Sequence, residues 1–358
     1  RFSKAIQTRD FFTVTKTADS ERLLPLPDGC YLVADTENTL RQRMKSDEGY
    51  MRSYCKNRFY TGSDIAAKLW VGDYQNGDSF HDLAQDAGGI RRLAVLRADI
   101  DNLGQAFVSG FESEKYGQKY VTLSRTATFS RKLALFFKLH VNTLLQEGEY
   151  SLHVNDEAGP RKATIVYSGG DDVFIIGAWD DIIGFAVDLN DSLSDYAQGT
   201  LTISAGIGIY PEKYPVAAMA RQTGELEDAS KAYPGKNAVT LFDESGTHSW
   251  DEFINAVLAE KYELIRDFFQ TMQDYGKSFL YRLLDLMRSR DEKINLARYA
   301  YLLARMEPGE KAPDESKKLY QEFSQKMYQW MLDEKACKQA ITALYIYVYT
   351  IRETAEGE

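Results

Sequence analysis

The stretch ATIVYSGGDDVFIIG, residues 163–177, decides the fold of the central part of the chain. Two short apolar runs, 163–167 and 173–177, flank Ser-Gly-Gly-Asp-Asp, which is rich in turn-forming residues. Apolar runs joined by so short a turn are typical of an antiparallel hairpin with buried strands. We therefore expect a hairpin whose tip carries two adjacent carboxylates.

The segments around this hairpin alternate between strand-like and helix-like patterns. The first six elements follow the order β-α-β-β-α-β, which is the split βαβ, or ferredoxin-like, arrangement and also the palm architecture of nucleotidyl transferases. In that arrangement the third strand lies between the first and the second and runs antiparallel to both. The expected elements are strand 93–98, helix 123–145, strands 163–167 and 173–177, a helix from about 179, strand 201–209, helix 216–231 and strand 238–242.

The pattern divides the chain into three parts and predicts an α+β fold. Residues 1–90 combine short apolar runs with Pro- and Gly-bearing turns, which indicates a small β-rich linker module. Residues 91–245 form the predicted palm. Residues 246–358 repeat apolar positions at helical spacing and predict a bundle of about five helices, opened by a capping box at Ser249 and Glu252.

Length and composition limit the kinds of protein that this chain can be. A length of 358 residues suits two or three domains at about 150 residues each. The net charge of −10 argues against a protein that coats nucleic acid by bulk charge, although it allows a local metal or phosphate site. Three widely spaced cysteines favour neither a zinc ribbon nor a disulfide framework, which suits a reducing, cytoplasmic compartment. The apolar stretch 341–351 is shorter than the roughly 20 residues that span a membrane.

Carboxylates gather at the predicted hairpin tip and beside it. Asp171 and Asp172 are adjacent, and Asp99 follows the apolar run 93–98 directly. Like charges this close repel one another, and a divalent cation is the usual means of keeping them ionised. Short acids suit Mg²⁺ or Mn²⁺, and two such ions would activate a hydroxyl and stabilise a leaving pyrophosphate. We favour Asp172 as a metal ligand and Asp171 as a second ligand or support.

Polar residues near these acids predict nucleotide contacts. A lysine is a good point-charge partner for a triphosphate, and glycines let the backbone approach a phosphate. Each motif alone is compatible with an ordinary turn, but all of them in this order favour a metal-dependent nucleotidyl transferase. The candidates for nucleotide contacts are Ser168, Gly169, Gly170, Ser204, Lys231 and Lys236.

Two other features favour structural roles. His81-Asp82 is an HD dipeptide, but the other histidines follow no pattern that would complete a phosphohydrolase site. The aromatic residues of the last part, Tyr320 to Tyr349, stand at helical spacing in an acidic chain. That spacing favours core packing or a protein interface over base stacking.

These motifs resemble the large signature subunit of type III CRISPR effector complexes, and more closely that of the III-A (Csm) type. The resemblance covers residues 65–242 as the family's second palm and extends more weakly over the bundle, while residues 1–64 would correspond to the segment between two palms. It rests on KLWVG at 68–72, RADIDNLG at 97–104, Ser124-Arg125, Phe136-Phe137, SGGDD at 168–172 and GKN at 235–237.

The resemblance implies an activity and a site. The family's second palm joins ATP into cyclic oligoadenylates, second messengers made when the complex binds target RNA, by attack of a 3′-hydroxyl on an α-phosphate. Asp99, Asp171, Asp172 and the backbone of Ile100 would hold two Mg²⁺ or Mn²⁺ ions, with ATP bound by the six residues named above. The implied partners are a small helical subunit, the subunit that binds the crRNA 5′-handle, crRNA and target RNA.

The resemblance also implies that the site is divided. The family's site lies between two palms, and an HD nuclease domain and a first palm normally precede the parts found here. A chain that begins at Arg1 fits the C-terminal half of such a subunit. We therefore expect this chain alone to show weak cyclase activity or none.

Two alternatives remain. A diguanylate cyclase-like enzyme of the GGDEF class shares the fold, but that class has Glu-Phe where this chain has Asp172-Val173. The other alternative is a non-catalytic scaffold whose helical part docks small helical subunits.

Overall fold

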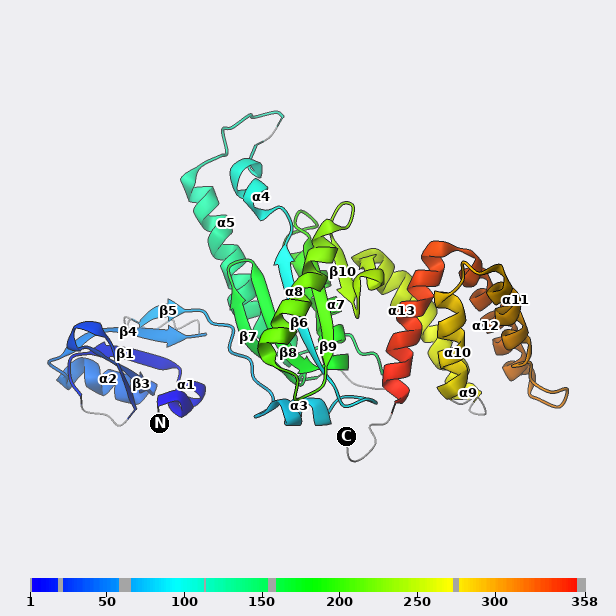
Figure 1. Ribbon diagram of the computed structural model, residues 1–358. Helices are drawn as coiled ribbons and strands as arrows, with labels where there is room; N and C mark the ends of the chain where they lie inside the picture. Colours follow the sequence, from blue (N-terminus) through cyan, green and yellow to red (C-terminus); the bar gives the residue numbers. More distant parts are fainter. Residues whose placement is uncertain are drawn as a thin grey trace.

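The structure is a computed structural model that describes residues 2–18, 22–57, 66–112, 114–153, 159–272 and 277–352. Arg1, on which the expectation of an upstream part rests, lies outside these ranges. An N-terminal module, a central sheet with its helices and a C-terminal helical bundle follow one another from left to right in Figure 1. The predicted α+β class is confirmed.

The N-terminal module is built on a five-stranded sheet of order β2-β3-β1-β4-β5. Phe12 and Ala34 pack with Ala5 on one side, while Phe11 and Leu40 pack on the other. The elements are α1 (Phe2–Thr8), β1 (Phe11–Thr15), β2 (Leu23–Pro25), β3 (Tyr31–Asp35), α2 (Glu37–Ser46), β4 (Tyr50–Lys56) and β5 (Ala66–Leu69).

The central sheet has six strands in the order β11-β10-β9-β6-β8-β7. β8 lies between β6 and β7 and runs antiparallel to both, as the split βαβ pattern predicted. β11 was not predicted, because its three residues are too short for an alternating pattern. The strands are β6 (Leu93–Ile100), β7 (Ala163–Gly169), β8 (Asp172–Ala178), β9 (Ile203–Tyr210), β10 (Ala238–Leu241) and β11 (Thr247–Ser249).

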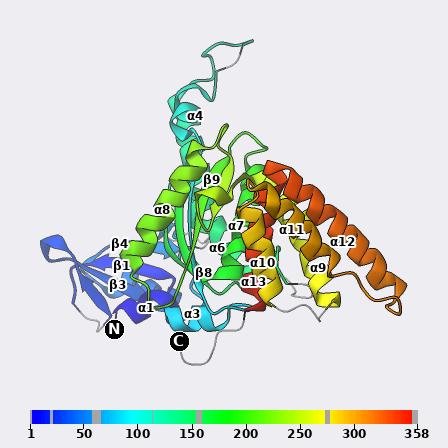
Figure 2. The ribbon, with the colours of Figure 1, turned by 45° about the vertical axis from the view of Figure 1, so that its right-hand side comes forward.

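Helices cover both faces of this sheet, which explains why β6 reads as a nearly continuous apolar run. On one face, Leu93 and Val95 pack against α3 (Phe80–Gln85) and α8 (Val216–Ala232). On the other face, Ala94 and Leu96 join the large core with α7 (Trp179–Tyr196). α8 lies across the front of the sheet in Figure 2.

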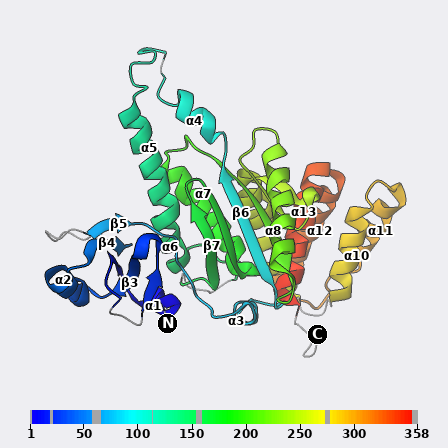
Figure 3. The same cartoon turned by 60° about the vertical axis from the view of Figure 1, so that its left-hand side comes forward.

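Two helices project beyond the sheet where β6 ends. α4 (Leu103–Ser109) and α5 (Leu123–Leu135) extend upward from the palm in Figure 3. The predicted helix 123–145 is interrupted, because a π-helical segment, η2 (Phe136–His140), separates α5 from α6 (Val141–Gln146). Sequence periodicity does not reveal such a one-residue change in winding.

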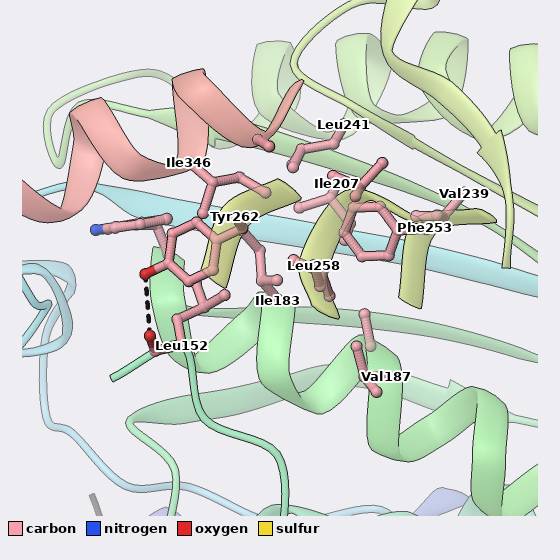
Figure 4. Packing of buried hydrophobic residues seen from close by; sticks show 14 of the residues in the cluster. Leu152, Ile183, Val187, Ile207, Val239, Leu241, Phe253, Leu258, Tyr262 and Ile346 are labelled. Carbon is pink, nitrogen blue, oxygen red and sulfur yellow. Dashed lines mark hydrogen bonds between the residues drawn. The ribbon is translucent and has the colours of Figure 1, made fainter. Parts of the chain in front are cut away.

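The C-terminal bundle shares one continuous core with the palm. Figure 4 shows Phe253 and Leu258 between Ile183 of α7 and Leu241 of β10, with Tyr262 donating a hydrogen bond to the carbonyl of Leu152 over 2.9 Å. The predicted bundle of about five helices is confirmed. Its helices are η4 (Glu252–Tyr262) continued by α9 (Glu263–Thr271), then α10 (Lys277–Arg288), α11 (Lys293–Ala304), α12 (Asp314–Leu332) and α13 (Glu334–Ile351).

Aromatic residues fill this bundle as the helical spacing predicted. Phe268 stacks on Phe323 with ring centroids 3.8 Å apart, and Tyr347 is buried against Phe269. The predicted capping box is only half formed. The Ser249 hydroxyl accepts from the Glu252 amide over 3.3 Å, but the Glu252 carboxylate binds Lys335 of α13 instead of returning to the cap. Among the described helices, none has the length and apolarity to cross a membrane.

Candidate active site

The candidate site is built on a row of residues that crosses four strands. Gly169 of β7 stands opposite Asp172 of β8, Asp172 opposite Asp99 of β6, and Asp99 opposite Ser204 of β9. Residues directly opposite one another in antiparallel strands share a face of the sheet. The row lies on the face that α8 covers. The sheet therefore brings together two acids that are 73 positions apart in sequence.

The hairpin turn consists of Gly170 and Asp171 alone, because β7 and β8 extend further toward the tip than predicted. The Asp171 carbonyl accepts from the Ile100 amide over 3.3 Å, which fixes the turn against the end of β6. Partial burial, followed by the negative charges of Asp99 and Asp172, raises the pKa of Asp171. These three carboxylates therefore lie close enough to repel one another.

Lys231 supplies the nearest positive charge. Its ammonium lies 2.8 Å from the Asp99 carboxylate and 2.6 Å from that of Glu227, one turn earlier on α8. Glu227 is buried and also bound by Arg97 over 3.0 Å. Partial burial works against the charge of Lys231, but the hydrogen bonds to Asp99 and Glu227 outweigh it and raise the pKa of Lys231. The lysine is therefore held as a cation beside Asp99.

The second predicted lysine, Lys236, lies in the loop between α8 and β10 and reaches the end of β6. The Lys236 ammonium donates to the Asn102 side-chain oxygen over 2.9 Å. Gly235, Lys236 and Asn237 all have positive φ, so the loop that carries Lys236 is tightly curled. The Asn237 amide donates to Asp101 over 3.0 Å and ties this loop to the end of β6.

Asp101 has a structural role in this arrangement. It is buried, and besides the Asn237 amide its carboxylate accepts from Ser204 over 2.7 Å and from Thr202 over 2.8 Å. Ser204, predicted to contact a nucleotide, is fully buried. In this structure Ser204 holds Asp101 under the loop that carries Lys236, and its predicted contact with a nucleotide stays a prediction.

Ser168 faces away from the row of acids. Its hydroxyl donates to the Phe137 carbonyl in η2, and a Cβ at Gly72 would collide with it. A π-helical turn changes the backbone hydrogen-bond pattern, and the serine gives Phe137 a donor. The predicted contact of Ser168 with ATP stays a prediction.

The two glycines serve different purposes. A Cβ at Gly169 would collide with the Tyr167 ring, whereas a Cβ at Gly170 would meet open space. Neither residue has positive φ, so the turn needs no left-handed glycine. The open space at Gly170 leaves room for a ligand beside Asp171.

A cavity of about 470 Å³ opens beside the end of β6. Its lining combines the aromatic rings of Phe111 and Phe129 with the side chains of Asn102, Gln105 and Thr202. A mixed apolar and amide lining of this kind suits a flat, hydrogen-bonding ligand such as a nucleobase. Because Asn102 also binds Lys236, the cavity and the lysine are neighbours.

The acidic set fits a divalent cation in its chemistry. Within the described ranges, no three His, Cys, Asp or Glu side chains are already arranged as a closed metal site. The Asp99 carboxylate is paired with Lys231 in this structure. Hard carboxylate oxygens that repel one another are the donors that Mg²⁺ and Mn²⁺ prefer. Asp99, Asp171 and Asp172 therefore fit such an ion once Lys231 is displaced from Asp99.

Sequence reasoning missed Glu227, Asp101 and Tyr167 as residues of this neighbourhood. Glu227 stands four residues before Lys231, a spacing that indicates a helical ion pair. The hydrogen bonds of Asp101 had no local signal. The HD dipeptide is structural, as predicted. His81 pairs with Glu212 over 2.8 Å on the surface of α3.

Comparison with known proteins identifies the family. The model for the second palm domain of Cas10/Cmr2 matches residues 92–240, and that for the second helical domain of the Cmr2 subunit of the CRISPR RNA silencing complex matches 266–353. Sequence relatives point the same way, since a Cas10/Csm1 protein of Mycobacterium tuberculosis is 46% identical over 92% of this chain. The chain belongs to the Cas10/Csm1 family of type III-A CRISPR systems.

These Cas10/Csm1 relatives are named single-strand-specific deoxyribonucleases. One from Streptococcus thermophilus is 40% identical over 99% of this chain. The chain spans 40% of the M. tuberculosis protein and 44% of the S. thermophilus protein.

Solved Csm1 structures share the fold. Csm1 of Thermococcus onnurineus superposes with a TM-score of 0.73 at 22% identity, over 96% of this chain and 49% of that one. A Csm1–Csm4 cassette in complex with cA4 gives a TM-score of 0.69 at 22% identity, over 97% of this chain and 49% of that one. A cassette in complex with one ATP gives 0.67 at 23% identity, over 96% and 48%.

Proposed function

We propose that this Cas10/Csm1 chain carries the nucleotidyl-transferring palm of a type III-A effector complex and joins ATP into cyclic oligoadenylates. The observation that carries the proposal is the register that sets Asp172 of the hairpin directly opposite Asp99, with Lys231 2.8 Å from Asp99. Two acids on adjacent palm strands beside a lysine suit metal-dependent phosphoryl chemistry. Structural neighbours have been solved in complex with ATP and with cA4, which supports ATP as the substrate and a cyclic oligoadenylate as the product.

The acidic residues would bind the metal ions, and Lys231 would contact the phosphates. Asp99, Asp171 and Asp172, with the backbone at Ile100, would hold Mg²⁺ or Mn²⁺, which activates the 3′-hydroxyl and neutralises charge on the phosphates. Lys231 leaves Asp99 and turns to the phosphates, and Glu227 keeps it within reach.

The remaining residues place the nucleotide. Lys236, which donates to the cavity-lining residue Asn102, offers a second positive charge to the triphosphate. Gly170 lets the phosphates come close to the turn. The base occupies the cavity against Phe111 and Phe129. Catalysis then rests on positioning and on electrostatic stabilisation of the leaving pyrophosphate.

We further propose that this chain supplies half of the complete site. The family resemblance implies a site shared by two palms, and the chain spans about two fifths of its curated relatives. The isolated chain should then convert ATP weakly or not at all. Robust ATP conversion by this chain alone would contradict the divided site.

The proposed setting is the effector complex. Structural neighbours were solved with Csm4, which supports contact with other Csm subunits. By the family resemblance, the partners would include the subunit that binds the crRNA 5′-handle and a small helical subunit that docks on the bundle. Contact with crRNA and target RNA would come through the complex. We do not propose the nuclease activity in the relatives' names for the part described here, because His81 of its HD dipeptide is exposed and hydrogen-bonded to Glu212.

The test is an Asp171→Ala/Asp172→Ala double substitution in the assembled complex, incubated with target RNA, Mg²⁺ and ATP. Mass spectrometry of the products should show cyclic oligoadenylates from the wild type and none from the variant, while assembly and RNA binding remain. Products from GTP in place of ATP would favour the diguanylate cyclase-like alternative. Unchanged output from the variant would leave only the scaffold role.

A further inference from the structure

Strand β7 carries an irregularity next to the acids. Its pairing with β8 shifts register between Ile165 and Tyr167, which leaves Val166 as the extra residue of a β-bulge. With unbroken alternation, Tyr167 would share a face with the buried Ile165, two residues before it. The bulge turns Tyr167 instead to the face that carries Asp172.

The Tyr167 side chain occupies a defined place on that face. Its phenol lies over Gly169, where any Cβ would collide with the hydroxyl end of the ring. Asp172 stands directly opposite Gly169 across the hairpin, so the hydroxyl end of the ring lies beside Asp172. The negative charge of Asp172, followed by desolvation, raises the pKa of Tyr167, as expected for a phenol beside a carboxylate.

Core packing does not account for this placement. Tyr167 is 52% exposed, so its ring adds little to the buried core. A bulge, a glycine and an exposed aromatic ring together aim one hydroxyl at one carboxylate. Groups that hydrogen-bond a metal-ligating carboxylate orient it and typically contribute a factor of about 10 to 100 in metal affinity or activity.

We propose that Tyr167 is a positioning residue of the nucleotidyl-transfer site, whose phenol hydroxyl holds the Asp172 carboxylate in the orientation that binds a divalent cation. The inference rests on the proposed function, because it takes Asp172 as a metal ligand. It adds a residue outside the Gly-Gly-Asp-Asp turn to that site. Tyr167 would act through Asp172 and would not contact the reacting atoms.

The direct test measures Mn²⁺ binding to the full chain, without nucleotide, by the loss of the free-ion electron paramagnetic resonance signal. The Tyr167→Phe variant keeps the ring over Gly169 and removes only the hydroxyl. We expect its site-specific Mn²⁺ affinity to fall about tenfold. Gly169→Ala, which displaces the phenol, should give a similar loss. Tyr301→Phe removes a phenol that is 67% exposed on α11 of the bundle and should leave the affinity unchanged.

The Asp172→Asn variant tests the proposed metal site independently of the role of Tyr167. If it loses Mn²⁺ affinity while Tyr167→Phe binds as the wild type does, the role of Tyr167 is wrong and the proposed metal site stands. If Asp172→Asn itself binds Mn²⁺ as the wild type does, the proposed metal site fails, and the role of Tyr167 fails with it.

A second readout uses the assembled complex with target RNA and ATP. Tyr167→Phe should lower kcat about tenfold with little change in KM for ATP, and a higher Mn²⁺ concentration should restore the rate. A loss of rate that Mn²⁺ does not restore, or a lowered melting temperature that accounts for it, would overturn the positioning role.

Discussion

Asp99 and Asp172 stand directly opposite each other on β6 and β8, and the Lys231 ammonium lies 2.8 Å from the first of them. The lysine takes the place that a cation would hold beside Asp99. Lys231 therefore offsets only part of the negative charge that Asp99, Asp171 and Asp172 bring together, and a metal ion that binds Asp99 must displace the lysine from it.

Asp99→Asn should abolish transfer while leaving the fold intact. The Asp99 side chain is about one quarter exposed, so neutralising it leaves no buried charge unpaired, and Glu227 still holds Lys231. We expect cyclic oligoadenylate output of the complex to fall by at least about 100-fold, since outer-sphere partners of metals alone account for 10 to 100-fold. Thermal unfolding should shift by little. A variant with half the wild-type output would contradict a ligand role for Asp99.

Asp101→Ala, only two residues away, should act on stability instead. Its loss leaves the Ser204 and Thr202 hydroxyls and the Asn237 amide without their acceptor. Unsatisfied buried donors cost about 1 to 3 kcal/mol each, so the loss of an acceptor for three donors should lower the free energy of unfolding by about 3 kcal/mol or more. Urea denaturation of the full chain measures this, with Asp99→Ala as the matched control.

Lys231→Met should have opposite effects on metal and on nucleotide. In the absence of ATP, Mn²⁺ no longer competes with the lysine for Asp99, so Mn²⁺ affinity of the chain should rise several-fold. In the assembled complex, the triphosphate loses a cationic partner, and the transfer rate should fall about tenfold or more, which corresponds to about 1.4 kcal/mol. Equal Mn²⁺ affinity in the variant and the wild type would show that Lys231 does not compete with Mn²⁺ for Asp99.

Ser168→Ala tests a hydroxyl that the structure assigns to the backbone of η2. Its removal leaves the Phe137 carbonyl without this donor, which should cost about 1 kcal/mol of stability. We expect KM for ATP in the complex to stay within about twofold of the wild type, because Ser168 faces away from Asp172. A tenfold rise in KM would instead support the ATP contact that the sequence motif suggests.

His248 should make the contact between palm and bundle sensitive to acid. Burial between β11 and α13 lowers the pKa of His248 to about 4, and its ring lies 2.9 Å from the Thr342 hydroxyl. The unfolded chain binds this proton near pH 6.5, so the stability that neutral His248 contributes is complete above that pH. It is lost as the pH falls from about 6.5 to 4, by up to about 3 kcal/mol.

Urea unfolding at a series of pH values measures this loss. A His248→Gln variant carries no group that titrates in this window, so the slope of its unfolding free energy against pH should be smaller than that of the wild type. Identical slopes would show that His248 is protonated without cost in the folded chain.

Much of the palm was predictable, because its strands are buried on both faces and its helices are amphipathic. Local patterns of that kind predicted the strand order β6-β8-β7 through the split βαβ rule and placed Asp99 beside the hairpin. The half-formed capping box at Ser249 shows that a local pattern does not fix the partner of a side chain when a distant residue packs nearby. Glu252 had a local partner in the sequence, but the packing of α13 brought Lys335 closer.

By itself, the sequence determined which chemistry this chain can carry, since the acids, the lysines and the order of strands are local properties. Tertiary structure alone decided how each side chain is used. One extra residue, Val166, shifts the register of β7 so that Gly169 and Tyr167 face Asp172 while Ser168 faces η2. A bulge reverses the alternation of every residue beyond it, and no composition or spacing in the chain announces that reversal.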